Sequence, residues 1–357
     1  MNNYIYFIAL LLLSCCTTHK MDNPEYRYST DLTKMEDGSL QVELRFSGDL
    51  PDTAYYCLPK IVPGIYDDTN FGKFIKGFKA FNDKGKLLDL KQLNTNCWQI
   101  YKAKELERIE YTAVHGWDNF DFEDNRPYRS AESHFNDSVF ILNPNSLFGF
   151  FKNQEDLPFR IAVKKNERLY GSSSLRKFSI SRDQDEYMAE NYRQLVDNPI
   201  MYALPDTTSI ELPNISVRIA SYSSTGKKLA DSLAISIAPL LKNQSDYLDG
   251  NLATDTYTFI VYHNENTENE RYLSDGLEHN QSTVVLMYSP LDMEVLKAIV
   301  FHIASHEFFH TVQPLGLHSY EIADFDFSDP KFSQHLWLYE GMTEYFTIHM
   351  RIKQKME

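Results

Sequence analysis

The sequence predicts a multidomain α+β protein, in which an N-terminal β-sandwich precedes a region that mixes helices and strands. Segments of alternating apolar and polar residues recur over residues 26–180, with turn residues between them, a pattern typical of a sandwich. Residues 226–346 contain both apolar segments of strand length and segments with apolar residues at helical spacing. The length of 357 residues, of which 43% are hydrophobic, is enough for two or more packed domains.

The first residues resemble an export signal, and we do not expect them to belong to the folded domains. Residues 4–13 form an apolar stretch that is too short to span a membrane as a helix. A Leu-Leu-Ser-Cys sequence ending at Cys15 follows and resembles the lipobox of bacterial lipoproteins. We therefore expect a signal peptide over residues 1–15, lipidation of Cys15, and a lipid-anchored protein of the bacterial cell envelope, in the periplasm or at the outer-membrane surface. Cys16 is an alternative site, and an ordinary cleaved signal peptide is an alternative to the anchor.

The expected sandwich occupies residues 24–186. Its clearest strands are expected at 41–46, 98–101 and 109–114. Turns are expected at 37–38, 63–64, 84–85 and 143–145. A charged and polar segment at 183–193 predicts the boundary to a second domain, residues 187–357. Cys57 and Cys97 fit either one disulfide or two separate buried thiols.

The second domain is expected to alternate helices and strands. Residues 226–242 carry a helical pattern, which Pro239 interrupts late. Residues 256–262 and 282–288 are continuous apolar or β-branched runs of strand length. A sheet followed by a long helix is therefore expected in this domain.

A metal-binding pattern lies on the helix that follows the last of these strands. Asp292 is its expected N-cap, and Pro314 ends it. His306 and His310 are four residues apart, so a helix places them on one face, where both imidazoles can bind one Zn²⁺. Glu307 follows the first histidine and can act as a general base on a water molecule beside the metal. The alternative is an amphipathic helix whose histidines are solvated or paired.

A catalytic zinc site needs a third protein ligand. Residues 335–346 have helical apolar spacing, and Glu340 and Glu344 are also four apart, so either carboxylate is a candidate, although both also fit a solvated helix face. His302 is too far along the first helix to share one ion with His310. A structural site would need a fourth ligand, such as His302 or His318.

The overall charge excludes one class of function. The formal net charge is −15 and the isoelectric point is near 5.2. An acidic chain without a basic block does not have the electrostatic footprint of a general nucleic-acid binder.

Several ordered segments together resemble a known family, the zinc peptidases that include bacterial glycyl aminopeptidases and are related to thermolysin-like enzymes with a glutamate third ligand (gluzincins). The segments that carry the resemblance are Pro63–Tyr66, Tyr192–Pro199, Gly276–His279, His306–His310 and Leu336–Tyr345. The resemblance extends over nearly the whole chain after the expected signal. It implies that the second domain is the first part of a thermolysin-like mixed α/β catalytic domain.

The resemblance also implies roles for single residues. Glu340 matches the third zinc ligand beside His306 and His310, and Glu344 then has a supporting role. Gly276 and Glu278 match a substrate-binding strand, whose glutamate binds the free α-amino group of a peptide in related aminopeptidases. A carboxylate near the metal can form an ion pair with an N-terminal ammonium and so select exopeptidase cleavage.

The chain departs from the family pattern at several places. Asp275 replaces the first glycine of the strand motif, and residues 67–71 replace an Arg-Asp-Phe sequence. Relatives continue beyond the point that corresponds to Glu357, with the rest of a helical domain that supplies an oxyanion-stabilising tyrosine, and usually with a PDZ-like domain. We therefore expect a truncated chain or a fragment of a longer protein.

The sequence thus predicts a zinc-dependent peptidase, with Zn²⁺ as cofactor and peptides as substrates. We expect an aminopeptidase that removes small N-terminal residues such as glycine and alanine, and strand 282–288 can pair with the peptide backbone. One alternative is an endopeptidase with the same zinc chemistry. Another is a surface lipoprotein that binds zinc and peptide without turnover because the chain is truncated.

Overall fold

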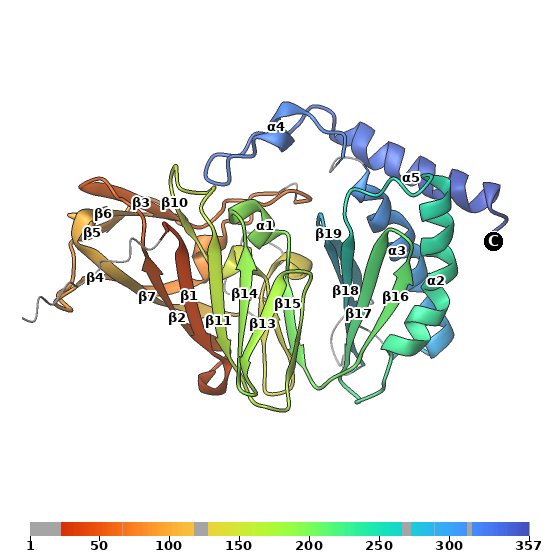
Figure 1. Ribbon diagram of the computed structural model, residues 1–357, viewed down its shortest axis with the longest axis horizontal. Coiled ribbons are helices and arrows are strands. Elements are labelled where there is room, and N and C mark those ends of the chain that lie inside the picture. Colours follow the sequence, from red (N-terminus) through yellow and green to blue (C-terminus); the bar gives the residue numbers. More distant parts are fainter. Residues whose placement is uncertain are drawn as a thin grey trace, which may run out of the picture.

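The computed structural model describes residues 23–65, 67–117, 128–265, 273–288, 290–312 and 316–356. The expected signal peptide and its lipidation site, Cys15, lie outside these residues. A large β-rich N-terminal part lies beside a C-terminal part in which helices cover one face of a sheet (Figure 1). The expected α+β class is therefore confirmed. Within the described ranges, no helix has the length and apolar character needed to cross a membrane.

Two sheets form the sandwich of the N-terminal part. A seven-stranded sheet has the order β13-β14-β11-β1-β2-β7-β4, and a four-stranded sheet has the order β10-β3-β6-β5. The first sheet contains β13 (Arg176–Ser181), β14 (Gln184–Ala189), β11 (Phe159–Lys164), β1 (Tyr26–Asp31), β2 (Ser39–Phe46), β7 (Leu106–Val114) and β4 (Ile75–Asn82). The second contains β10 (Phe150–Phe151), β3 (Thr53–Cys57), β6 (Cys97–Tyr101) and β5 (Leu90–Gln92). The three expected strands lie within β2, β6 and β7.

Aromatic side chains from both sheets meet in the sandwich core. The buried hydroxyl of Tyr56 on β3 lies 2.9 Å from the Tyr28 hydroxyl on β1 and 3.1 Å from the Tyr111 hydroxyl on β7. Each buried phenol thus keeps a hydrogen-bond partner, which offsets the cost of desolvating it. Cys57 and Cys97 are opposite one another on β3 and β6 and form a disulfide, the first of the two alternatives that the sequence left open.

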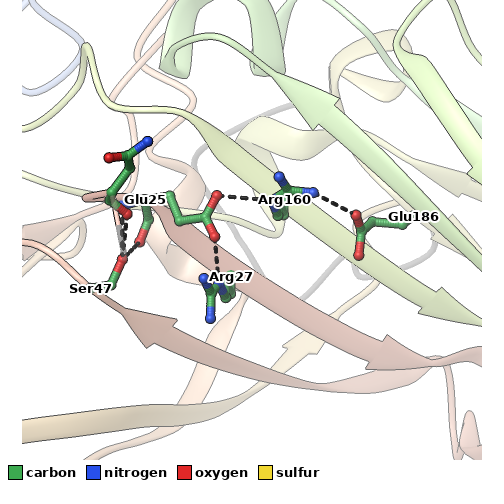
Figure 2. Close-up of polar contacts among 6 residues, drawn as sticks. Glu25, Arg27, Ser47, Arg160 and Glu186 are labelled. Atoms are coloured by element: carbon green, nitrogen blue, oxygen red, sulfur yellow. Dashed lines mark hydrogen bonds and ion pairs between the residues drawn. The ribbon is translucent and has the colours of Figure 1, made fainter. Parts of the chain in front are cut away.

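A cluster of charged side chains lies on the seven-stranded sheet and links its neighbouring strands (Figure 2). Glu25 accepts hydrogen bonds from Arg27 and from Arg160 Nε, the latter at 2.8 Å. Arg160 Nη1 also donates to Glu186 at 2.8 Å, and the Glu25 amide donates to Ser47 Oγ at 3.0 Å. The cluster joins the residues around β1 to neighbouring strands, and its half-exposed ion pairs add little to stability.

A third sheet connects the sandwich to the C-terminal part. Its order is β12-β15-β9-β8, formed by β12 (Tyr170–Ser172), β15 (Ile200–Ala203), β9 (Phe140–Leu142) and β8 (His134–Phe135). The segment around the expected boundary is regular structure, since β14 is followed by α1 (Tyr192–Val196) and by β15. Strand β15 pairs with β9 and β12, so the N-terminal sheets include residues beyond 186.

The C-terminal part is built on a mixed sheet of order β16-β17-β18-β20-β19. Its strands are β16 (Thr207–Leu212), β17 (Ile215–Ser223), β18 (Thr256–Asn264), β20 (Ser282–Tyr288) and β19 (Leu273–Glu278). One face packs against helices α2 (Ala230–Tyr247) and α3 (Met293–Glu307) (Figure 1). The other face meets the third sheet, where Ile260 and Leu286 share a buried cluster with Ile141 and Met201.

Helix α3 begins as the sequence predicts and ends earlier. The Asp292 side chain accepts a hydrogen bond of 2.9 Å from the Val295 amide, which satisfies one free donor of the first turn. Leu296, Val300 and Ala304 are buried against the sheet and α2. The α-helix stops at Glu307, and a 3₁₀ turn, η6 (Phe308–Thr311), carries the chain onward; such tightening is common at helix ends.

The remaining helices are short turns, apart from one long helix near the end of the chain. Helix α5 (Leu336–Lys353) contains the expected second helical segment, and it is joined to η6 by a segment that includes α4 (Tyr320–Ala323). The single 3₁₀ turns of the N-terminal part are η1 (Leu32–Lys34), η2 (Phe71–Phe74), η3 (Ala103–Glu105), η4 (Arg129–Ala131) and η5 (Pro144–Ser146).

Candidate metal and substrate site

Three metal-binding side chains converge where α3 and η6 meet α5. The Nε2 atoms of His306 and His310 are 3.1 Å apart. Glu340 Oε2 lies 3.4 Å from the first and 3.7 Å from the second. One donor atom from each residue thus falls within 4.8 Å of the others. Two imidazoles and one carboxylate are the donor set of a catalytic zinc site with an open coordination position.

Side chains behind these donors hold the two imidazoles in place. Glu344 Oε2 lies 3.1 Å from His306 Nδ1, and Thr343 Oγ1 lies 3.4 Å from His310 Nδ1. Each histidine therefore contacts a polar partner through the nitrogen that does not face the candidate metal position. Such partners orient metal-binding histidines and raise their basicity. Thr343 was not singled out from the sequence, although its place three residues after Glu340 puts both on one helix face.

The electrostatic environment at His306 favours a cation. Burial opposes protonation of this imidazole, but its ion pair with Glu340 and the charges of Glu307 and Glu344 raise its pKa to about 9. The same carboxylates would favour a bound divalent ion, whose charge would take the place of the proton. The donor set and the surrounding charge therefore fit a metal of the zinc type.

Glu307 lies next to these donors with an unused oxygen atom. Its Oε2 is buried, and no described residue provides it with a hydrogen-bond partner. Burial, followed by the charge of Glu278, raises the pKa of Glu307 well above its usual value. A Cβ atom added at Gly276 would lie 3.2 Å from Glu307 Oε1. Gly276, which the sequence analysis assigned to substrate binding, thus leaves room for this carboxylate beside strand β19.

Glu278 closes the site on the side of the N-terminal part. A carboxylate oxygen of Glu278 lies within 4.8 Å of donor atoms of Glu307 and His310. Burial and the charge of Glu340 raise its pKa. Gly64 lies directly against it, since a Cβ atom added there would be 2.7 Å from Glu278 Oε1. Residues 63–66 contribute to the family resemblance, but no local pattern predicts that Gly64 touches this carboxylate.

A small pocket of about 40 Å³ opens beside Glu278. Its walls come from the 61–65 turn, from the end of β19 and from residues 322–339. A loop of the N-terminal part, the end of β19 and α5 therefore form one cleft, with Glu278 between the pocket and the candidate metal ligands.

Asp275, the residue that departs from the family pattern, connects β19 to the N-terminal part. Its Oδ2 accepts a hydrogen bond of 2.8 Å from Ser130 Oγ, and burial raises its pKa. The carboxylate of Asp275 thus links β19 to Ser130, and a glycine at this position could not accept this hydrogen bond.

The two histidines considered as additional ligands lie elsewhere. His302 and His318 are both exposed, and neither belongs to the cluster of His306, His310 and Glu340. Among the residues that the structure describes, this cluster has three protein donors, which is the arrangement of a catalytic and not of a structural zinc site.

Comparisons with known proteins agree with the resemblance drawn from the motifs. A family model described as the Peptidase M61 N-terminal domain matches residues 27–204, and one described as M61 glycyl aminopeptidase matches residues 300–356. No curated protein matches the chain.

Several solved structures share the fold. An aminopeptidase N family protein from Idiomarina loihiensis is 21% identical with a TM-score of 0.74, and the match covers 91% of this chain and 54% of that one. An M1 zinc metallopeptidase from Deinococcus radiodurans is 10% identical with a TM-score of 0.50, over 94% and 71% of the two chains. Yeast LTA4 hydrolase, in complex with bestatin, is 12% identical with a TM-score of 0.50, over 93% and 48%.

At these low sequence identities, the structural matches show a shared fold alone. The chain spans about half the length of the Idiomarina protein. The two matched family regions lie in the same order as the sandwich and the helices that carry the candidate metal ligands. Together with the ordered motifs, they show that the chain belongs to the M61 glycyl aminopeptidase family.

Proposed function

We propose that this protein is a zinc-dependent aminopeptidase that removes small N-terminal residues, such as glycine and alanine, from peptides. The observation that carries the proposal is the convergence of His306, His310 and Glu340 beside the buried carboxylates of Glu307 and Glu278. Membership of the M61 family supports a peptidase.

His306, His310 and Glu340 would hold the zinc ion. Zn²⁺ held by two histidines and a glutamate polarises a carbonyl group and makes water a nucleophile near neutral pH. Glu344 and Thr343 keep the two imidazoles oriented through their Nδ1 atoms. The protein thus supplies a fixed donor set and needs little rearrangement to bind the ion.

Glu307 is the proposed general base. Its Oε2, which has no hydrogen-bond partner among the described residues, is available to take the proton from the attacking water and to return it to the leaving amine. Burial and the charge of Glu278 raise its pKa, which makes the carboxylate a stronger proton acceptor. Burial also keeps the proton transfer away from bulk water.

Glu278 is the proposed partner of the substrate's α-amino group. An ammonium group bound there would place the first peptide bond beside Glu307 and the metal ligands, because Glu278 is within 4.8 Å of donor atoms of Glu307 and His310. The turn at Gly64 closes the cleft behind this carboxylate. A substrate extended in the N-terminal direction would have to displace that turn, which favours cleavage after the first residue.

The test is Glu307→Gln in the zinc-loaded protein. We expect the variant to retain one zinc per chain and to lose about 10²- to 10⁴-fold in kcat/KM on alanyl p-nitroanilide, because the amide cannot accept the proton. Metal analysis and steady-state kinetics on one preparation measure both. The matched control is Glu294→Gln, on the solvent side of the same helix, where the carboxylate pairs with Lys297. Cleavage by Glu307→Gln at the parent rate would contradict the assignment.

Selection of free N-termini is tested with acetylated substrates. We expect acetylalanyl peptides to resist cleavage and Glu278→Gln to raise the KM of unblocked peptides. Equal cleavage of blocked and unblocked peptides would instead support the endopeptidase alternative. Zinc binding without hydrolysis of any peptide would support the non-catalytic alternative.

We also propose that the protein is exported and anchored to a membrane by a lipid on Cys15. The Leu-Leu-Ser-Cys sequence supports this, as does the Cys57–Cys97 disulfide, since disulfides persist outside the reducing cytosol. Metabolic labelling with a fatty acid, lost in Cys15→Ser, tests the anchor.

A further inference from the structure

We propose that residues 316–335, between η6 and α5, act as a strap through which the N-terminal part positions Glu340, the third candidate metal ligand. The anchor of this strap is Phe327. It is a positioning residue for zinc binding, because it acts through α5 and not by contact with the ion. The inference rests on the proposed zinc peptidase and deepens it.

The end of α5 that carries Glu340 has little packing of its own. The Glu340 side chain is 38% exposed. Among residues 336–342, all of which the structure describes, only Tyr339 is buried. The later turns of the helix are held by buried residues such as Thr343 and Met350. The first turns of α5 therefore depend on support from outside the helix.

Hydrogen bonds at the base of the strap provide this support. The Ser319 amide donates to the Tyr339 hydroxyl at 2.7 Å, one residue before Glu340. The Ser319 hydroxyl donates to Ser333 Oγ at 3.0 Å, and the His335 amide donates to the same atom at 3.1 Å. The two ends of the strap thus meet beside the first turn of α5, as in a compact Ω-type loop.

The tip of the strap is fixed to the N-terminal part, which it reaches near α1 and β10 (Figure 1). Phe327 is 5% exposed and belongs to the core of that part. Its ring meets the fully buried ring of Tyr192 edge-on, with centroids 5.0 Å apart. Its carbonyl accepts a hydrogen bond of 2.8 Å from the Lys60 amide, and Arg193 donates to the Ile322 carbonyl.

A continuous path of contacts therefore joins the sandwich core to the helix turn that holds Glu340. Functional side chains have to be held within about 0.5 Å of their productive positions. Loss of the groups that orient metal ligands lowers metal affinity by about 10- to 100-fold. Without the anchor, Glu340 would lie on a weakly supported helix end, whereas His306 and His310 would keep their places on α3 and η6.

The first experiment measures the zinc affinity of Phe327→Leu in the full chain, by competition with a fluorescent zinc chelator. Leucine stays apolar but loses the ring contact with Tyr192, so we expect the Kd for zinc to rise about tenfold. Phe135→Leu is the matched control, because Phe135 is also buried but lies on β8, outside the strap. It should leave the Kd unchanged. An unchanged Kd in folded Phe327→Leu would overturn the inference.

Tyr339→Phe breaks the path at the other end of the strap. It removes the hydroxyl that accepts the Ser319 amide and keeps the ring, so it serves as the test if Phe327→Leu does not fold. We expect the Kd for zinc to rise about tenfold, with no further rise when the two substitutions are combined, because both break one path. Tyr345→Phe, at an exposed position of the same helix, is the control and should leave the Kd unchanged. Independent, multiplying effects of the two substitutions would overturn the inference.

Failure of the strap can be distinguished from failure of the proposed enzyme. Weaker zinc binding by the strap variants, when the wild type hydrolyses no peptide, would support the strap and contradict the enzyme. Peptide hydrolysis by the wild type with equal zinc affinity in all variants would overturn the strap and leave the enzyme intact. A wild-type chain that binds no zinc would overturn both.

Discussion

At the residue scale, the candidate site depends on close contacts between residues that are distant in the sequence. Gly64 is the clearest case, because it touches the Glu278 carboxylate from another part of the fold. Its φ of +88° lies in the region that favours glycine. Any side chain at this position would both strain the turn and displace the carboxylate.

Gly64→Ala is therefore expected to impair substrate binding more than stability. The added Cβ would lie 2.7 Å from Glu278 Oε1, so we expect the KM for unblocked peptides to rise about tenfold. The backbone strain should lower the free energy of unfolding by about 1 kcal/mol. Steady-state kinetics and urea unfolding measure the two effects.

Gly226→Ala is the matched control for this variant. Gly226 also has a positive φ, of +74°, but an added Cβ would meet no atom within 4 Å. It should show a similar loss of stability with unchanged KM. A normal KM in Gly64→Ala would show that the contact does not position Glu278.

At the element scale, burial of apolar side chains prevails over local helix propensity. The sequence predicts an interruption at Pro239, yet α2 continues to Tyr247. Pro239 itself is exposed, whereas Ile237, Leu240 and Leu241 are buried against the sheet and α3. Their burial outweighs the missing hydrogen bond of the proline, which costs about 3 kcal/mol in a helix interior.

Pro239→Ala is accordingly expected to stabilise the protein. Alanine restores the amide donor at an exposed position of α2, so the free energy of unfolding should rise by about 1–3 kcal/mol. Urea unfolding followed by circular dichroism measures the change. Ser232→Ala, in the first turn of the same helix, is a control that should shift stability by less than about 0.5 kcal/mol. A destabilised Pro239→Ala would indicate that the proline fits a bend on which the packing depends.

At the scale of the whole molecule, a buried interface joins the sandwich part to the C-terminal part. His134 lies in this interface, with its ring stacked on Trp117 at 4.3 Å between centroids and edge-on to Tyr262. Burial, followed by the nearby His115 and Arg129, lowers the pKa of His134 from 6.5 to about 3. The imidazole is therefore neutral in the folded protein at physiological pH.

We expect the free energy of unfolding to fall as the pH is lowered through this window. The unfolded chain protonates His134 below about pH 6.5, whereas the folded protein resists protonation down to about pH 3, so acid favours unfolding by a few kcal/mol. Glu132 acts in the opposite direction, because burial raises its pKa to about 7. The comparison of wild type with His134→Gln isolates the histidine, and the variant should lose part of the acid sensitivity. Identical pH profiles would contradict this role.

Local chemistry made much of this protein predictable from the sequence. The spacing of His306 and His310 places them on one face, and apolar runs specify β18 and β20, because such patterns depend only on residues a few positions apart. The expected α+β class and the M61 relationship followed from the order of such segments. The cluster of His306, His310 and Glu340 is present as the resemblance implied.

Tertiary structure decided what no local pattern encodes. Only the folded chain brings Gly64 to Glu278, packs Phe327 against Tyr192 and forms a pocket from four distant segments. It also selected the disulfide over two free thiols by placing Cys57 opposite Cys97 on adjacent strands. These features depend on packing between elements that lie hundreds of residues or several strands apart, and packing is set by the whole core. The sequence by itself thus determined which side chains are candidate metal ligands, because their types and spacing are local, and the fold determined the shape of the cleft beside them.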